Sequence, residues 1–103
     1  MMEATASRTV TIVNPQGLHA RPADMFVKLA NRFSSTVSVR KGHETVDGKS
    51  ILSILTLGAE EGTQLEIMAT GQDAEAALAA LCELVDQGFE LNEPSEANNS
   101  PWL

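Results

Sequence analysis

The sequence alternates between two spacings of apolar residues, and this alternation constrains the fold more than any other feature. In residues 9–13, 36–40 and 63–69 apolar and polar residues alternate, as they do in strands with one buried face. Residues 44–46 are predicted to form a short returning strand, because the Lys-Gly-His stretch at 41–43 is typical of a hairpin connection. The chain is therefore expected to contain four half-buried strands.

Three other stretches have the spacing of helices. Residues 23–33 and 73–88 carry apolar residues every three or four positions, so each is predicted to be an amphipathic helix, with Asp73 as the N-cap of the second. The expected start of the first helix is Pro22, because the residue before a proline is biased away from the α region. Residues 50–57 are followed by a glycine and are predicted to form a short helix.

The order of these segments predicts the class of fold. It reads strand, helix, strand, strand, short helix, strand, helix, and each strand has one apolar face. This pattern is typical of a four-stranded, mainly antiparallel sheet with helices packed on one face and water on the other. We therefore predict an α+β fold, an open-faced two-layer β-sandwich of order βαββαβα. The order of the strands within the sheet does not follow from the sequence.

A chain of 103 residues is large enough for one domain with a single core. We expect this domain to span residues 8–91, between a disordered N-terminal segment at 1–7 and a flexible acidic tail at 92–103 that contains an unexplained Trp102. Residues 1–7 contain no basic residue, and no long apolar stretch follows them, so neither a signal peptide nor membrane insertion is expected. The lone Cys82 is predicted to be a buried, reduced thiol, which favours a cytoplasmic location.

Charge is distributed unevenly along the chain. The net charge of −7 argues against a nucleic-acid partner. All seven lysines and arginines lie in residues 1–50, whereas residues 51–103 carry acidic residues and no basic one. This asymmetry predicts a cationic docking face that would steer an acidic partner or an anionic group. The alternative is that the charges mix once the chain folds.

The short central helix has more apolar residues than one face can bury, with Ser50 as its expected N-cap. These apolar residues are Ile51, Leu52, Ile54, Leu55 and Leu57. We expect Leu52 and Ile51 to project outward as a partner surface, while the other three face the core. A fully buried helix is the alternative.

The turn before the first helix carries the run Gly17-Leu18-His19-Ala20-Arg21-Pro22. A helix start offers unpaired N–H groups and the positive end of the macrodipole, and both favour an anion. Arg21 adds a planar charged fork that suits phosphate oxygens, and the imidazole of His19 can act as a nucleophile. The motif therefore predicts a nucleophile in a phosphate cradle, and the alternative is that His19 is an ordinary solvated loop residue.

With this motif at the first strand-to-helix turn and Lys49-Ser50-Ile51 opening the short helix, the chain resembles the HPr family. HPr is the histidine-containing phosphocarrier of the bacterial phosphoenolpyruvate:sugar phosphotransferase system. The resemblance covers about residues 8 to 90 and implies an open-faced sandwich with three helices on one face. It implies that His19 accepts a phosphoryl group on Nδ1 from phosphorylated enzyme I and passes it to enzyme II A domains.

The resemblance also implies roles for the residues around His19. Arg21 and the backbone N–H groups of Ala20 and Arg21 would hold the phosphate, and Ser50 aligns with a serine that HPr kinase/phosphorylase modifies in some bacteria. Partner contacts would involve Ala20, Lys28, Lys49, Ile51 and Leu52. Ser53 departs from the residue expected in the family, and the tail extends past the family's usual end. A monomer without a cofactor is expected.

Other functions remain as alternatives. One is a regulatory binding module, either a nitrogen-related paralogue or a protein controlled through Ser50, in which Ser50 could also be only an N-cap. Another is an unrelated ligand-binding domain. Metal chemistry is not expected, because the histidines and the cysteine lack ligand spacing. ATP binding is not expected either, because Gly48-Lys49-Ser50 is preceded by His43 where a phosphate-binding loop needs its first glycine.

Overall fold

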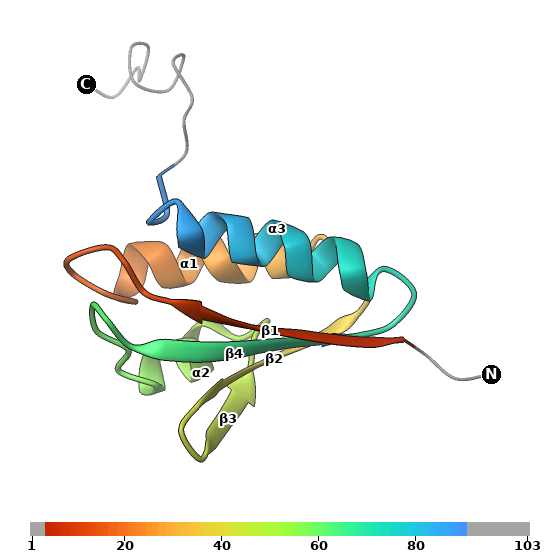
Figure 1. Cartoon of the computed structure of the whole chain (residues 1–103), viewed down its shortest axis with the longest axis horizontal. Coiled ribbons are helices and arrows are strands. Elements are labelled where there is room, and N and C mark those ends of the chain that lie inside the picture. Colours follow the sequence, from red (N-terminus) through yellow and green to blue (C-terminus); the bar gives the residue numbers. More distant parts are fainter. Residues whose placement is uncertain (1–3, 91–103) are drawn as a thin grey trace, which may run out of the picture.

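The structure, a computed structural model, describes residues 4–90 of the chain. Within these residues the elements follow the predicted order βαββαβα. The strands are β1 (Thr5–Thr11), β2 (Thr36–Lys41), β3 (Glu44–Asp47) and β4 (Gln64–Thr70), and the helices are α1 (Ala20–Ala30), α2 (Ile51–Thr56) and α3 (Ala74–Asp86). Helices α1 and α3 lie side by side over one face of the sheet (Figure 1). The predicted α+β two-layer fold is confirmed.

The four strands form one sheet in the order β1-β4-β2-β3, and every neighbouring pair is antiparallel. Strand β4 is therefore central, although it comes last along the chain. Val39 of β2 is paired with Ile67 of β4 on one side and with Val46 of β3 on the other. The antiparallel pairing of β1 with β4, in which Thr11 lies opposite Gln64, brings the loop after β1 close to the loop before β4, where the candidate site lies.

The N-terminal boundary differs from the prediction. Strand β1 includes Thr5, Ala6 and Ser7, so the expectation of a disordered segment at 1–7 is wrong for these three residues. They pair with the end of β4 in the register of Thr5 with Thr70, and Ala6 turns its side chain into the core with only 9% exposed. Pairing with β4 and the burial of Ala6 stabilise residues 5–7 as a strand, although their own sequence has no clear strand pattern. The tail at 92–103, with Trp102, lies outside the described residues.

The core lies between the sheet and the helices. Ile54 of α2, Ile67 of β4 and Leu81 of α3 are fully buried, and they form one cluster with Val10 of β1 and with Ile12, which directly follows β1. Cys82 is also fully buried, as predicted, and burial raises the pKa of its thiol. None of the helices in the described part of the chain is long and apolar enough to cross a membrane.

The start of α3 departs from ordinary capping. Asp73 is the N-cap residue as predicted, but its side chain makes no capping bond to the helix. Its carboxylate instead accepts hydrogen bonds from the N–H groups of Ser34 and Ser35 at 2.9 Å and from the Ser35 hydroxyl. The Ser35 hydroxyl and the Ser34 N–H lower the pKa of Asp73 to about 2. The carboxylate thus ties the start of α3 to the segment that leads into β2.

Candidate functional site

The loop between β1 and α1 is fixed by its contact with the loop before β4. The N–H of Leu18 donates to the Ala59 carbonyl at 2.8 Å, and the Leu18 side chain is buried. Gly17 has φ of +70°, and a Cβ atom there would stand 2.4 Å from the Ala59 oxygen. Only glycine fits this left-handed conformation and close approach without strain. The residue that follows Leu18 is therefore held at a defined place on the surface.

His19 is that residue, and it is the N-cap of α1. Its backbone is extended, with φ −87° and ψ −167°, and its carbonyl accepts the first helical bond, from the Ala23 N–H, at 2.9 Å. Helix α1 therefore begins at Ala20, and the predicted start at Pro22 is wrong. The bias against α conformation before a proline is outweighed here by this bond and by the burial of Pro22 and Ala23.

The His19 side chain is exposed, and within residues 4–90 it makes no hydrogen bond. The N–H groups of Ala20 and Arg21 next to it likewise have no acceptor in the described part of the chain. Pro22 at the third helical position has no N–H to satisfy. The helix start thus presents two unpartnered donors and the positive end of its dipole beside the imidazole, an arrangement that favours an anion.

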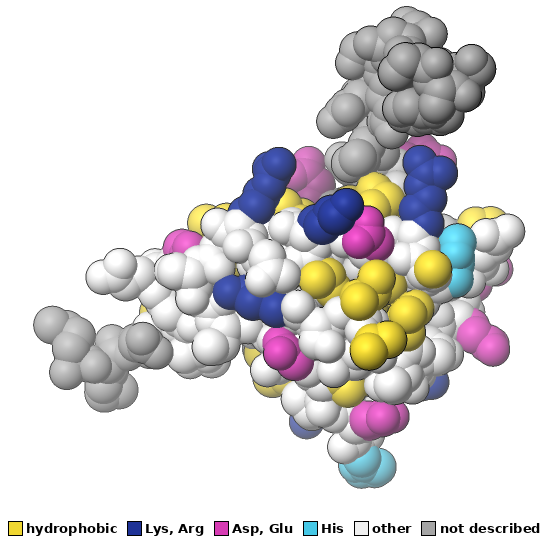
Figure 2. All heavy atoms as spheres, turned by 180° about the vertical axis from the view of Figure 1, so that it is seen from behind, with side chains coloured by type: hydrophobic (Ala, Val, Ile, Leu, Met, Phe, Trp, Pro, Cys, Tyr) yellow, Lys and Arg dark blue, Asp and Glu magenta, His cyan; other side chains and the backbone are white. Residues whose placement is uncertain are grey.

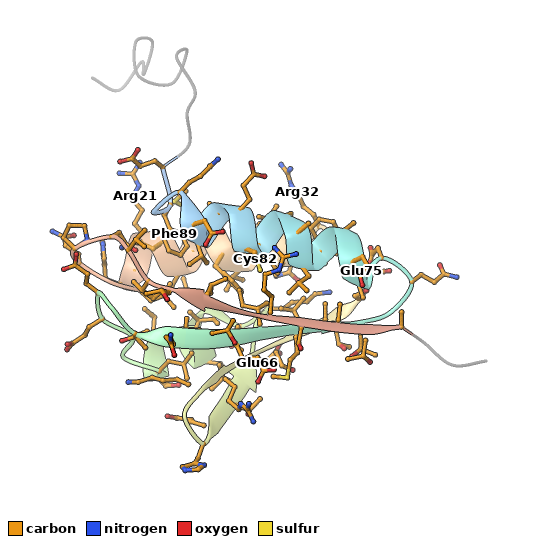
Figure 3. All side chains as sticks on the ribbon, viewed as in Figure 1. Arg21, Arg32, Glu66, Glu75, Cys82 and Phe89 are labelled. Atoms are coloured by element: carbon orange, nitrogen blue, oxygen red, sulfur yellow. The ribbon has the colours of Figure 1, made fainter. Side chains whose placement is uncertain are left out.

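Arg21 is exposed and forms no ion pair among the residues that the structure describes. Its side chain extends away from the sheet, on the side of the molecule where α3 ends at the turn containing Phe89 (Figure 3). By contrast, Lys28 pairs with Asp24 at 3.2 Å and Arg40 pairs with Glu66. The Arg40–Glu66 pair joins a residue of the basic half of the sequence to one of the acidic half.

Ser50 is the N-cap of α2, as predicted. Its hydroxyl oxygen accepts a hydrogen bond from the Ser53 N–H at 3.3 Å, and the residue is half-buried. The preceding Lys49 is also half-buried, and its ammonium donates to the Phe33 carbonyl after the end of α1 at 2.7 Å. Lys49 therefore links the two helices as well as facing the surface next to Ser50.

Helix α2 exposes part of its apolar surface. Leu52 is 74% exposed and Ile51 is half-buried, whereas Ile54 and Leu57 are buried. The prediction that Leu52 projects outward is confirmed, and the alternative of a fully buried helix is wrong. Leu55, expected in the core, is only half-buried. Figure 2 shows hydrophobic side chains gathered on this face, with lysine and arginine side chains above them and a histidine at the edge.

The chemistry available at this surface is that of an imidazole, an arginine and backbone N–H groups. Residues 4–90 hold no group of three or more His, Cys, Asp or Glu side chains that could bind a metal ion. The family model described as "PTS HPr component phosphorylation site" matches residues 6–87. The chain belongs to the HPr family. Members of this family are phosphocarriers of the phosphotransferase system, so the chain is a phosphocarrier and not a catalytic enzyme.

Individual HPr relatives agree with the family model. The phosphocarrier protein HPr of Pseudomonas aeruginosa is 42% identical over 85 residues, which are 82% of this chain and 94% of that protein. The phosphocarrier protein NPr of Shewanella violacea is 40% identical over 83 residues, 81% of this chain and 91% of that one. A crystal structure of HPr-C-His from Thermoanaerobacter tengcongensis is 42% identical, with a TM-score of 0.80 over 84% of this chain and 99% of that one.

Sequence reasoning missed one residue near the site of this HPr-family protein. Asn14 is not among the predicted site residues, yet its side-chain amide donates to the Gly17 carbonyl at 2.7 Å. The signal that could have found it is the Asn-Pro-x-Gly spacing, because asparagine side chains often bond backbone groups within a turn.

Proposed function

We propose that this protein accepts a phosphoryl group on His19 from phosphorylated enzyme I and transfers it to enzyme II A domains of the phosphoenolpyruvate-dependent sugar phosphotransferase system. The observation that carries the proposal is the position of His19. Its exposed imidazole makes no hydrogen bond within residues 4–90 and directly precedes the unpartnered N–H groups of Ala20 and Arg21. A nucleophile and a site for an anion therefore meet at one helix start.

The phosphoryl group moves in two steps, and in each step one bond to phosphorus forms and one breaks. The lone pair on Nδ1 of His19 attacks the phosphorus carried by enzyme I, the bond between the phosphorus and enzyme I breaks, and the enzyme I atom keeps that electron pair. The guanidinium of Arg21 and the N–H groups at the start of α1 then neutralise the charge on the phosphoryl oxygens. In the onward step a nucleophile of the enzyme II A domain attacks the phosphorus, the bond to Nδ1 breaks, and Nδ1 regains its electron pair.

An exposed site suits a carrier because phosphoryl transfer depends mainly on positioning and charge stabilisation. One arginine and two N–H donors stabilise the phosphoryl group on His19, but they do not enclose it, so it can be transferred to the next protein. The docking partner supplies the rest of the surroundings. We propose that partners contact Ala20, Lys28, Lys49, Ile51 and Leu52, with the exposed Leu52 as the apolar contact and the lysines facing acidic groups.

We further propose a monomer that works in the cytoplasm without a cofactor. The fully buried Cys82 is consistent with a reducing compartment. A carrier whose small surface must meet several partners in turn has to keep the face around His19 and Leu52 free.

A second candidate is a regulatory phosphocarrier that serves a nitrogen-related pathway or is controlled through Ser50. The relatives named NPr, at 40% identity, favour it. Phosphorylation of Ser50, for example by an HPr kinase/phosphorylase, would add about two negative charges at the start of α2, close to the exposed Leu52. Such a charge would repel an acidic partner while leaving the fold intact.

The test is phosphorylation by enzyme I from the same organism with phosphoenolpyruvate as donor. We expect an acid-labile, alkali-stable label on the wild-type chain and none on His19→Ala, while Arg21→Ala is labelled more slowly. Addition of purified enzyme II A domains then separates the two candidates. Rapid loss of label to a sugar-specific A domain supports transport, whereas transfer only to a nitrogen-related A domain supports the regulatory role.

A further inference from the structure

We propose that Asn14 is a positioning residue for phosphoryl transfer and that it acts on His19 through the carbonyl group of Gly17. This inference rests on the function proposed above. Asn14 lies outside the motif that carries the site, on the far side of the turn, and touches no reacting atom. Its contribution is to fix the peptide on which the position of the histidine depends.

The Gly17 carbonyl oxygen accepts two hydrogen bonds. One comes from the Asn14 side-chain nitrogen Nδ2 at 2.7 Å and the other from the His19 N–H at 3.0 Å. The Gly17 N–H in turn donates to the Asn14 carbonyl at 3.0 Å, so Asn14 holds the Gly17 residue at both of its ends. On the opposite side the Ala59 oxygen leaves no room even for a Cβ atom on Gly17. The peptide between Gly17 and Leu18 is therefore fixed by hydrogen bonds on one side and by close packing on the other.

The fixed Gly17 peptide matters because the His19 side chain itself makes no hydrogen bond within residues 4–90. Within the described residues no hydrogen bond reaches the His19 ring, so its location follows from its backbone alone. That backbone is bonded at its N–H to the Gly17 carbonyl and at its carbonyl to Ala23. Removal of the Asn14 amide would leave the Gly17 carbonyl, which forms the first of these two supports, without its other hydrogen bond. A displacement of about 1 Å at a reacting group can cost on the order of a hundredfold in rate.

The other end of the Asn14 amide makes no hydrogen bond within residues 4–90. Its oxygen Oδ1 is buried and has no hydrogen-bond partner among the described residues. The residue lies beside Gly88, where a Cβ atom would stand 3.9 Å from the Asn14 Cβ, so the end of α3 helps to shield it. A buried acceptor without a partner opposes folding by more than a typical donor bond favours it. The bond from Nδ2 to the Gly17 carbonyl is therefore the one hydrogen bond that the side-chain amide makes within residues 4–90.

The test compares Asn14→Ala, Asn14→Asp and Asn14→Gln as substrates of enzyme I. Alanine and ionised aspartate cannot donate to the Gly17 carbonyl, whereas glutamine keeps the amide donor on a longer side chain. We expect kcat to fall about tenfold for Ala and Asp, with KM for the chain within about twofold of the wild type, and Gln to recover part of kcat. The melting temperature of Asn14→Ala should change by less than about 4 °C.

Ser35→Ala serves as the control, because it removes a buried hydroxyl bonded to Asp73 at the other end of the domain. It should lower the melting temperature but leave kcat and the His19 amide resonance unchanged, while Asn14→Ala shifts that resonance. Normal kcat for Asn14→Ala, or a loss explained by KM alone, would overturn the inference while the proposed function stands. An unlabelled wild-type chain would refute both.

Discussion

Replacing Gly17 with alanine tests how closely the loop of His19 is built on the loop before β4. The added Cβ would lie 2.4 Å from the Ala59 carbonyl oxygen and 2.9 Å from the Glu60 Cα. Both are backbone atoms, so neither can swing aside as the end of a side chain could. The loop must shift, and the hydrogen bond from Leu18 to Ala59 must lengthen or break.

The magnitude follows from two separate costs. A non-glycine residue in the left-handed region costs about 1–2 kcal/mol, and forcing an extra carbon into packed surroundings costs about 1–3 kcal/mol. Alanine also stiffens the unfolded chain, which returns about 0.4–1 kcal/mol. We therefore expect Gly17→Ala to lower the free energy of unfolding by about 1–4.5 kcal/mol, which leaves a protein of ordinary stability folded.

Gly42→Ala is a matched control for the cost of placing alanine in the left-handed conformation. Gly42 lies at the tip of the β2–β3 hairpin with φ of +61°, and a Cβ atom there meets nothing within 4 Å. Its loss of stability should be about 1 kcal/mol, so the difference between the two variants measures the contact with Ala59. Urea unfolding followed by circular dichroism gives both values.

The variants Gly17→Ala and Gly42→Ala should also differ in their rate of phosphorylation. Gly17→Ala moves the segment that carries His19, so phosphorylation by enzyme I should slow, whereas Gly42→Ala should be phosphorylated at the wild-type rate. Equal unfolding free energies for the two variants, within about 0.5 kcal/mol, would refute the reasoning. Equal phosphorylation rates would show that the Ala59 contact does not position the site.

Three further changes test other parts of the structure. The pKa of Asp73 lies below its usual value, so its carboxylate stabilises the fold above about pH 4 and loses this effect as the pH falls toward 2; Asp73→Asn should be less stable at neutral pH and should lose that pH dependence in acid unfolding. Leu52→Ala should change the free energy of unfolding by less than about 0.5 kcal/mol yet weaken enzyme I binding measured by calorimetry, while Ile54→Ala should cost about 2–5 kcal/mol. Ser50→Ala should lose about 0.5–1 kcal/mol in urea unfolding, because its capping bond is long, and Ser50→Asp should keep the cap.

Much of the fold could be predicted from local patterns. The alternation of Leu65, Ile67 and Ala69 correctly predicted a strand with one buried face, and all three side chains are buried. The order of the strands could not be predicted, because antiparallel pairing of β1 with β4 depends on contacts between distant segments. The early start of β1 at Thr5 was missed for the same reason, since the partner at Thr70 supplies its support.

The site was predicted in part. The position of His19 at a helix start follows from the glycine and proline around it, and the structure places it there. Its roles, with those of Arg21 and Ser50, stay predictions until phosphorylation is measured. The Asn14 contact was missed although the Asn-Pro-x-Gly spacing carries a signal for it. The serine partners of Asp73 could not be predicted from sequence, because they lie on a distant segment whose position is set by the folded chain.

Phosphorylation of His19 is the most direct test of the account. The protein, incubated with phosphoenolpyruvate and catalytic enzyme I, should gain one phosphoryl group by mass spectrometry, and ³¹P NMR should show a phosphohistidine signal assigned to Nδ1. The signal should vanish in His19→Ala and pass to an enzyme II A domain when one is added. A phosphoryl group that persists in His19→Ala, or a wild-type chain that gains none, would contradict the account.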